Sequence, residues 1–103
     1  LWKSAPQHGV FRNQQNQKWF GIIMYVEQAK ITAGEGKIDV LNVKVNPDER
    51  EALFGTIGIY PAYHLNKKNW ISILLNDSVP DAKIMQLVDA SYRIVQGEGK
   101  KKR

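Results

Sequence analysis

One segment of the chain, residues 60–70, concentrates side chains that could bind a nucleic acid. Its two lysines could neutralise phosphates, its two asparagines could hydrogen-bond to phosphates or base edges, and its aromatic rings could stack on unpaired bases. The candidate contacts in this segment are His64, Asn66, Lys67, Lys68 and Trp70. A simpler interpretation is that Asn-Lys-Lys-Asn forms a solvated turn and that the aromatic rings anchor the loop in the core. Composition alone favours this second interpretation.

A second polar and basic loop is expected nearer the N-terminus. Arg12 and Lys18 bracket the amide-rich run Asn-Gln-Gln-Asn-Gln at residues 13–17. If this loop projects from the fold, the two cations could contact phosphates, although Asn and Gln are also ordinary turn residues. The terminal Lys-Lys-Lys-Arg run could add sequence-independent attraction to nucleic acid, and a solvated tail is the simpler interpretation.

The residue types that common enzymatic chemistry needs are scarce. The chain has no Cys and two His, which excludes thiolate zinc sites and cysteine nucleophiles. It contains neither a Gly-x-Ser-x-Gly elbow nor a His-Glu-x-x-His motif, and Gly34-Glu35-Gly36 lacks the Lys-Ser/Thr pair of a phosphate-binding loop. We therefore expect a protein that is not an enzyme, with no catalytic residue, no cofactor and no metal site.

The net charge does not by itself indicate a nucleic-acid-binding protein. The 103 residues carry a formal charge of +5, but residues 100–103 are all basic, so the rest of the chain is close to neutral. Any argument for nucleic-acid binding must therefore rest on a local cluster of cations.

The length and the apolar pattern predict one domain without a membrane span. We assign residues 1–97 to a single domain and residues 98–103 to a basic, frayed tail. The longest apolar run, at residues 22–26, is far shorter than the ~20 residues that cross a bilayer. No apolar leader opens the sequence, so we expect a cytoplasmic protein that does not contact membranes.

Turn signals and β-branched or aromatic runs predict four strands. They lie at residues 9–12, 18–26, 37–45 and 70–75. In the third strand Val43 and Val45 should face a buried side, while Asn42 and Lys44 face the other side, as in a half-buried strand. Residues 58–64 are expected to form a loop, because Pro61 biases the preceding residue out of helical space.

Capping signals predict two helices. Asn46 as N-cap, Pro47 at the first helical position and Gly55 at the end predict a short helix over residues 47–54. A second helix should begin near Pro80 and end at Gly97. Its inner stripe at helical spacing is Ile84, Leu87, Val88, Ser91, Tyr92 and Val95. Strands followed by helices predict an α+β domain, with a mainly antiparallel β-sheet packed against two or three helices.

Several segments together resemble the MmcQ/YjbR family of small bacterial proteins. The segments that carry the resemblance are residues 60–75, Ser-Val-Pro-Asp at 78–81, Leu-Val-Asp-Ala-Ser-Tyr at 87–92, the strands at 9–12 and 39–44, and Asn-Pro-Asp at 46–48. Asn69 and Leu65 depart from the family pattern, which often has His and Met there. The family usually starts with a helix ahead of the first strand, and that helix is missing or truncated here, as expected for a C-terminal domain of a longer chain.

The resemblance implies a fold similar to that of secretion chaperones and a DNA-binding function through two basic wings. It implies no enzymatic activity and no cofactor. On this interpretation Arg12, Lys18 and the candidate contacts of residues 60–70 touch DNA. The alternative is a protein-interaction domain of a larger bacterial protein with no catalytic activity, whose partner is another protein or the rest of its own chain. The nearly neutral body of the chain favours this alternative.

Overall fold

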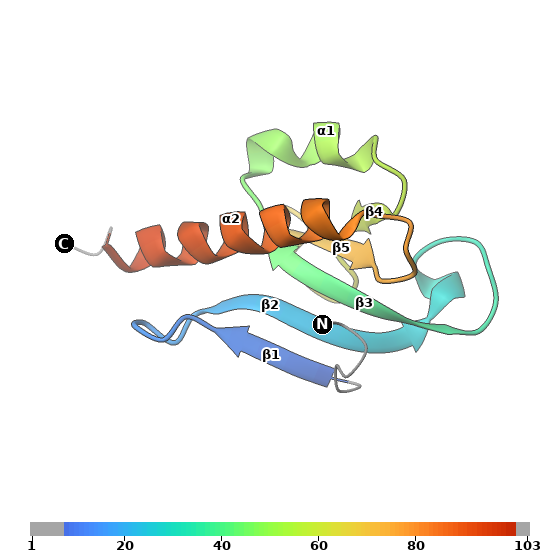
Figure 1. Cartoon of the computed structure of the whole chain (residues 1–103), viewed down its shortest axis with the longest axis horizontal. Coiled ribbons are helices and arrows are strands. Elements are labelled where there is room, and N and C mark those ends of the chain that lie inside the picture. The colour runs from blue at the N-terminus through green and yellow to red at the C-terminus, as the bar shows by residue number, and fades with distance from the viewer. Residues whose placement is uncertain (1–7, 101–103) are drawn as a thin grey trace.

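The computed structural model describes the backbone of residues 8–100 and the side chains of residues 9–97 (Figure 1). Five strands form one sheet in the order β1-β2-β3-β5-β4, and every neighbouring pair is antiparallel. The strands are β1 (His8–Arg12), β2 (Trp19–Glu27), β3 (Lys37–Lys44), β4 (Ile59–Pro61) and β5 (Trp70–Leu74). The α+β class and the mainly antiparallel sheet are confirmed, while the expected truncation of an N-terminal helix concerns residues 1–7, which lie outside the described residues.

Two α-helices accompany the sheet. A 3₁₀ turn, η2 (Pro47–Glu49), leads into α1 (Arg50–Phe54), and a second 3₁₀ turn, η1 (Gln28–Lys30), follows β2. The Asn46 side chain accepts a hydrogen bond of 3.0 Å from the Asp48 backbone N–H, so the predicted cap is confirmed. The predicted helix over 47–54 is thus present, with a 3₁₀ first turn.

The long helix α2 (Asp81–Lys100) runs past its predicted end at Gly97. Gly97 is absent from the glycines with positive φ, so it does not adopt the left-handed conformation by which glycine usually ends a helix. The prediction of a stop at Gly97 was wrong for this reason. Within residues 8–100, no helix is long and apolar enough to cross a membrane.

The strand β4 was missed, since residues 58–64 were expected to form a loop. Pro61 pushes Tyr60 into extended space, and extended backbone is as compatible with a strand as with a loop. Because β4 is the last strand in the sheet order, the missing N–H of Pro61 does not interrupt a central ladder.

The main core lies between the sheet and the helices, and α2 crosses over β2 and β3 (Figure 1). Its buried side chains are Ile23, Leu41, Val43, Val45, Ile59, Ile71, Ile73, Val79, Ile84 and Leu87. The predicted inner stripe of the helix provides part of this layer. The aromatic ring of Tyr92 also meets Phe20 of β2 edge to face, with ring centroids 5.0 Å apart.

Ser91 joins α2 to two strands at the point where β2 and β3 separate. Its hydroxyl donates a 2.6 Å hydrogen bond to the Phe20 carbonyl and accepts a 2.9 Å bond from the Lys44 backbone N–H. The last paired residues of this ladder are Gly21 and Val43, so the Ser91 hydroxyl takes the place of the next rung. The segment at residues 87–92 therefore acts in the structure as a joint between the helix and the sheet.

The helix-free face of the sheet is also covered, by loops. The buried residues of this face are Ile22, Ala62 and Trp70 in one cluster and Ile38, Val40 and Leu74 in another. Leu65 packs on the first cluster and Ile31 on the second. Asn42, which was expected on a solvent-facing side, is fully buried because the segment between β4 and β5 covers it.

Candidate nucleic-acid interface

Both predicted basic loops leave the sheet at the same end. Arg12 of β1 pairs with Trp19 of β2, and Lys44 of β3 pairs with Trp70 of β5. Gly21 lies opposite Val43, so the start of β2, the end of β3 and the start of β5 are neighbours. The loop between β1 and β2 and the loop before β5 therefore extend from one end of the molecule, which we call the basic end.

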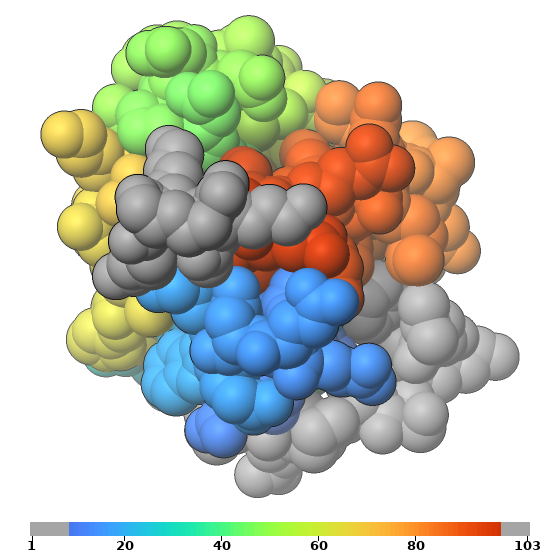
Figure 2. Space-filling model, turned by 90° about the vertical axis from the view of Figure 1, so that its left-hand side faces the viewer, coloured from blue at the N-terminus to red at the C-terminus, as the bar shows by residue number. Residues whose placement is uncertain are grey.

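Cations from widely separated parts of the sequence meet at the basic end. They are Arg12, Lys18, Lys44, Arg50, Lys67, Lys68 and Arg93. Figure 2 faces this end, where the loop between β1 and β2 (blue), the loop before β5 (yellow) and the α1 region (green) surround the last turns of α2 (red). Among the side chains that the structure describes, the carboxylates near this end are Asp48, Glu49, Glu51 and Asp89.

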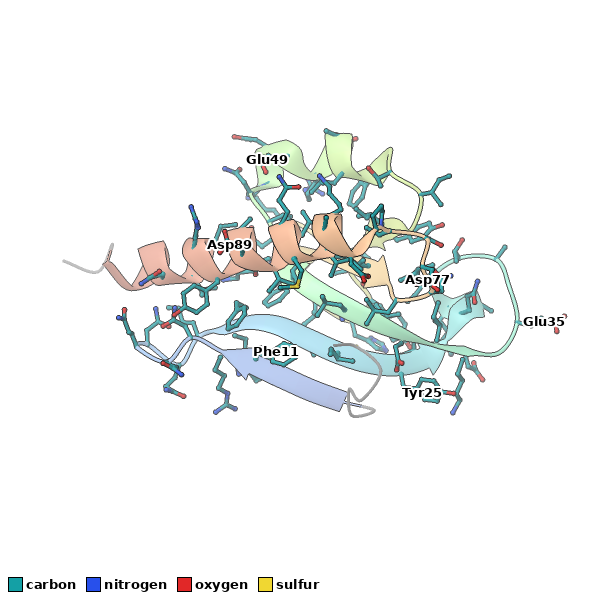
Figure 3. The ribbon with its side chains drawn as sticks, viewed as in Figure 1. Phe11, Tyr25, Glu35, Glu49, Asp77 and Asp89 are labelled. Carbon is teal, nitrogen blue, oxygen red and sulfur yellow. The ribbon has the colours of Figure 1, made fainter. Side chains whose placement is uncertain are left out.

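The opposite end of the sheet carries more acidic than basic residues. Among the described residues its carboxylates are Glu27, Glu35, Asp39, Asp77 and Asp81, and its cations are Lys37 and Lys83. Lys30 lines a small pocket together with Lys67 and is counted with neither end. Figure 3 shows Glu35 and Asp77 far from Glu49 along the long axis. The described chain is therefore electrically polarised, although its total charge is small.

The loop between β1 and β2 is held in shape by Asn13. The Asn13 side-chain oxygen accepts hydrogen bonds of 2.8 Å and 3.3 Å from the backbone N–H groups of Gln15 and Asn16. The Asn16 amide donates a 2.9 Å bond to the Val95 carbonyl, which ties the loop to α2. The guanidinium of Arg12 lies 6.0 Å from the centroid of the Trp19 ring, within cation–π range.

The loop before β5 presents Lys67 and Lys68 on an exposed tip. The Asn66 side-chain oxygen accepts a 2.7 Å bond from the Lys68 backbone N–H, and the Asn66 carbonyl accepts a 3.0 Å bond from the Trp70 N–H. Arg50 of α1 donates a 3.3 Å bond to the Lys67 carbonyl. Asn66 thus stabilises the turn, and its side-chain oxygen accepts an intramolecular hydrogen bond.

A buried polar network fixes the base of this loop to the sheet. The Asn42 amide donates a 3.2 Å bond to the Ile22 carbonyl, and its oxygen accepts a hydrogen bond from the Ser72 hydroxyl. The same hydroxyl accepts a 3.0 Å bond from the Tyr63 backbone N–H. Asn42 and Ser72 are both fully buried. Because the interior has a low dielectric constant, a buried polar group that loses its partner costs free energy, and the network therefore fixes the geometry of these residues.

The expectation that Trp70 stacks on unpaired bases is not compatible with its burial. The residue is 8% exposed and packs with Ile22 and Ala62 on the helix-free face. The Lys44 ammonium lies 5.9 Å from the centroid of the Trp70 ring. The interpretation that aromatic side chains anchor the loop in the core therefore holds for Trp70.

His64 and Tyr63 lie together where the chain enters this loop. The two ring centroids are 4.0 Å apart. His64 is exposed and has a φ of 62°, a left-handed conformation that is uncommon outside glycine. His64 is thus accessible to a ligand, and Tyr63 is half-buried.

Sequence reasoning missed three cations of the basic end, namely Lys44, Arg50 and Arg93. Each lies outside the two loops that composition singled out. Only the strand order places Lys44 beside Trp70, and only the tertiary fold brings Arg50 onto the Lys67 carbonyl. The one signal available in the sequence was the alternation of apolar and polar residues in the third predicted strand, which placed Lys44 correctly on the same face as Asn42.

Comparison with known proteins gives a consistent family match. The family model of YjbR matches residues 1–94. An uncharacterised protein of Bacillus subtilis, YyaQ, is 35% identical over 96 residues, which span 92% of this chain and 81% of that protein. An uncharacterised protein of Escherichia coli K12, YjbR, is 39% identical over 54 residues, covering 52% of this chain and 46% of that protein.

Solved structures share the fold. A crystal structure of a Pseudomonas syringae protein superposes with a TM-score of 0.82 at 37% identity, over 90% of this chain and 80% of that chain. A Deinococcus radiodurans protein superposes with a TM-score of 0.58 at 23% identity, over 93% of this chain and 73% of that chain, which indicates a common fold.

Proposed function

The chain belongs to the YjbR family, and from this premise we propose that it is a cytoplasmic, non-catalytic module that binds DNA through its basic end. The observation that carries the proposal is the meeting of seven cations at one end of a nearly neutral body. Cations that neutralise phosphates release condensed counterions, which supplies most of the affinity in sequence-independent binding. The acidic opposite end would orient the protein, because DNA repels carboxylates.

The geometry of the loops supports this function. The Asn66 turn and the bond from Arg50 hold the backbone of the tip that carries Lys67 and Lys68. A loop that is already ordered loses less conformational entropy when it binds. We therefore expect Lys67 and Lys68 to be the strongest phosphate contacts, with Arg12 and Lys18 on the neighbouring loop as a second set.

Neutralising the tip of the loop tests the proposal. The salt slope is the slope of the logarithm of the binding constant against the logarithm of the salt concentration. In the double variant Lys67→Gln/Lys68→Gln, this slope should become shallower by about 1.8, because each lost phosphate contact removes about 0.9. Fluorescence anisotropy of a labelled duplex across a salt series measures this slope. The matched control is Lys37→Gln/Lys83→Gln, which removes the same charge from the opposite end. Equal slopes in the two double variants would rule out the basic end as the binding surface.

One observation favours the alternative of a protein-interaction domain. An open groove of about 590 Å³ lies on the helix-free face beside the edge strand β1. Its lining is mainly apolar and includes Val10, Trp19 and Met24. The test is the mass of the protein in solution as a function of concentration. A dimer that forms at high concentration and is abolished by Val10→Lys would favour the alternative.

A further inference from the structure

A second feature of the basic end is a cleft beside the loop before β5. The cleft has a volume of about 480 Å³ and opens between the end of β3, the start of η2 and the last turns of α2. Its polar lining consists of Lys44, Asn46, Asn69 and Arg93. Asn69 is one of the two asparagines that the sequence suggested as contacts, while Lys44, Asn46 and Arg93 lie outside the two loops that it singled out.

The chemistry of the lining suits an anion. It combines two cationic residues with two asparagines, and none of the described residues that line it is acidic. The Asp89 carboxylate lies next to the cleft, and its Oδ2 is 3.0 Å from the Arg93 Nε. This contact engages Nε rather than the terminal nitrogens, and with 76% of the Arg93 side chain exposed it is screened by solvent.

The walls of the cleft are fixed by hydrogen bonds between elements. The Val45 backbone N–H donates a 2.8 Å bond to the Asn69 carbonyl, which holds the loop before β5 against the end of β3. The Lys44 N–H donates to the Ser91 hydroxyl, which holds α2 against the same strand. The Asn46 oxygen is engaged by the Asp48 N–H, which leaves the Asn46 Nδ2 group as a donor.

The position of the cleft connects the two basic loops. On one side α2 leads to the loop between β1 and β2 through the bond from Asn16 to the Val95 carbonyl. On the other side Asn69 belongs to the same loop as Lys67 and Lys68. A phosphate in the cleft would therefore lie on a path between the two loops.

We propose that this cleft seats one phosphate group of the bound DNA, with charge-assisted hydrogen bonds from Lys44 and Arg93 and with the amides of Asn46 and Asn69 as further donors. The inference rests on the proposed function, since it assigns a place for the DNA backbone within the same surface. A phosphate bound in the cleft would make the two basic loops parts of one continuous DNA-binding surface.

The test compares the full chain with the variant Lys44→Gln/Arg93→Gln. A single phosphate seat predicts that the salt slope of duplex binding becomes shallower by about 0.9. A change near zero, or one near 1.8 that indicates two separate phosphate contacts, would overturn the single seat. Lys83→Gln, at the opposite end of α2, is the control for a lost surface charge. Since Lys44 lies over the Trp70 ring, Arg93→Gln is also measured alone.

A second measurement follows the cleft directly. In nuclear magnetic resonance spectra, the side-chain amide signals of Asn46 and Asn69 should shift when a duplex of about 12 base pairs, slightly longer than one helical turn, is added. The shift should be smaller in the variant Arg93→Gln. If Lys67→Gln/Lys68→Gln weakens binding while the cleft variants behave as Lys83→Gln does, the seat is wrong and the DNA-binding function stands. If the full chain shows no salt-dependent binding to the duplex, both proposals fail.

Discussion

Replacing Trp70 with alanine is expected to lower the free energy of unfolding by about 3–5 kcal/mol, as truncation of a buried tryptophan usually does. The ring fills the helix-free face between Ile22 and Ala62, and only 8% of the residue is exposed. Its loss leaves a cavity beneath the loop that carries the tip lysines. Urea unfolding, followed by circular dichroism, measures the change from the shift of the midpoint at constant m-value.

Trp19 provides the matched control for Trp70. It is 44% exposed and lies on the same face of the fold, so Trp19→Ala should cost only about 1 kcal/mol. The two variants separate a core residue from a base-stacking residue. If Trp70→Ala leaves the unfolding midpoint unchanged and removes affinity for single-stranded DNA, Trp70 binds bases and its assignment to the core is wrong.

The second large effect is expected at the buried network. Asn42→Ala should lower the free energy of unfolding by about 2–4 kcal/mol, because the Ile22 carbonyl and the Ser72 hydroxyl each lose a partner inside the protein. The backbone amide of Tyr63, which donates to the Ser72 hydroxyl, should also exchange its hydrogen faster. Denaturant unfolding and hydrogen exchange measure the two effects.

A double-mutant cycle with Ser72→Ala tests whether these residues act together. The double variant should lose less stability than the sum of the single variants, since each single change already leaves the other side chain unpaired. Gln86→Ala, on the exposed side of α2, is the control for a lost amide. Simple additivity of Asn42→Ala and Ser72→Ala would contradict a coupled network.

The long elements could be predicted from the sequence because their signals are local. Four strands were found from apolar and β-branched runs, and the short helix was found from Asn46 and Pro47. β4 has three residues and carries no recognisable period. The burial of Asn42 could not be predicted either, because the residues that enclose it come from later in the chain, as its hydrogen bond with Ser72, 30 residues later, illustrates.

The candidate site was predictable only in part, for a related reason. Composition found the two loops, but it could not show that they share one end of the sheet, since this depends on the strand order. Composition also led to the wrong expectation for Trp70, because an aromatic residue next to lysines in the sequence is compatible both with a binding loop and with a loop anchored in the core. Burial distinguishes the two, and burial is a property of the fold.

The most direct measurement compares DNA binding by the full chain with a variant in which the four basic residues of the tail, Lys100, Lys101, Lys102 and Arg103, are replaced by glutamine. Fluorescence anisotropy with labelled duplex DNA across a salt series is the readout. Binding by the basic end predicts that the tail variant still binds near physiological salt, and that Lys67→Gln/Lys68→Gln weakens it further. Loss of all binding with the tail charges would contradict a DNA site on the folded body.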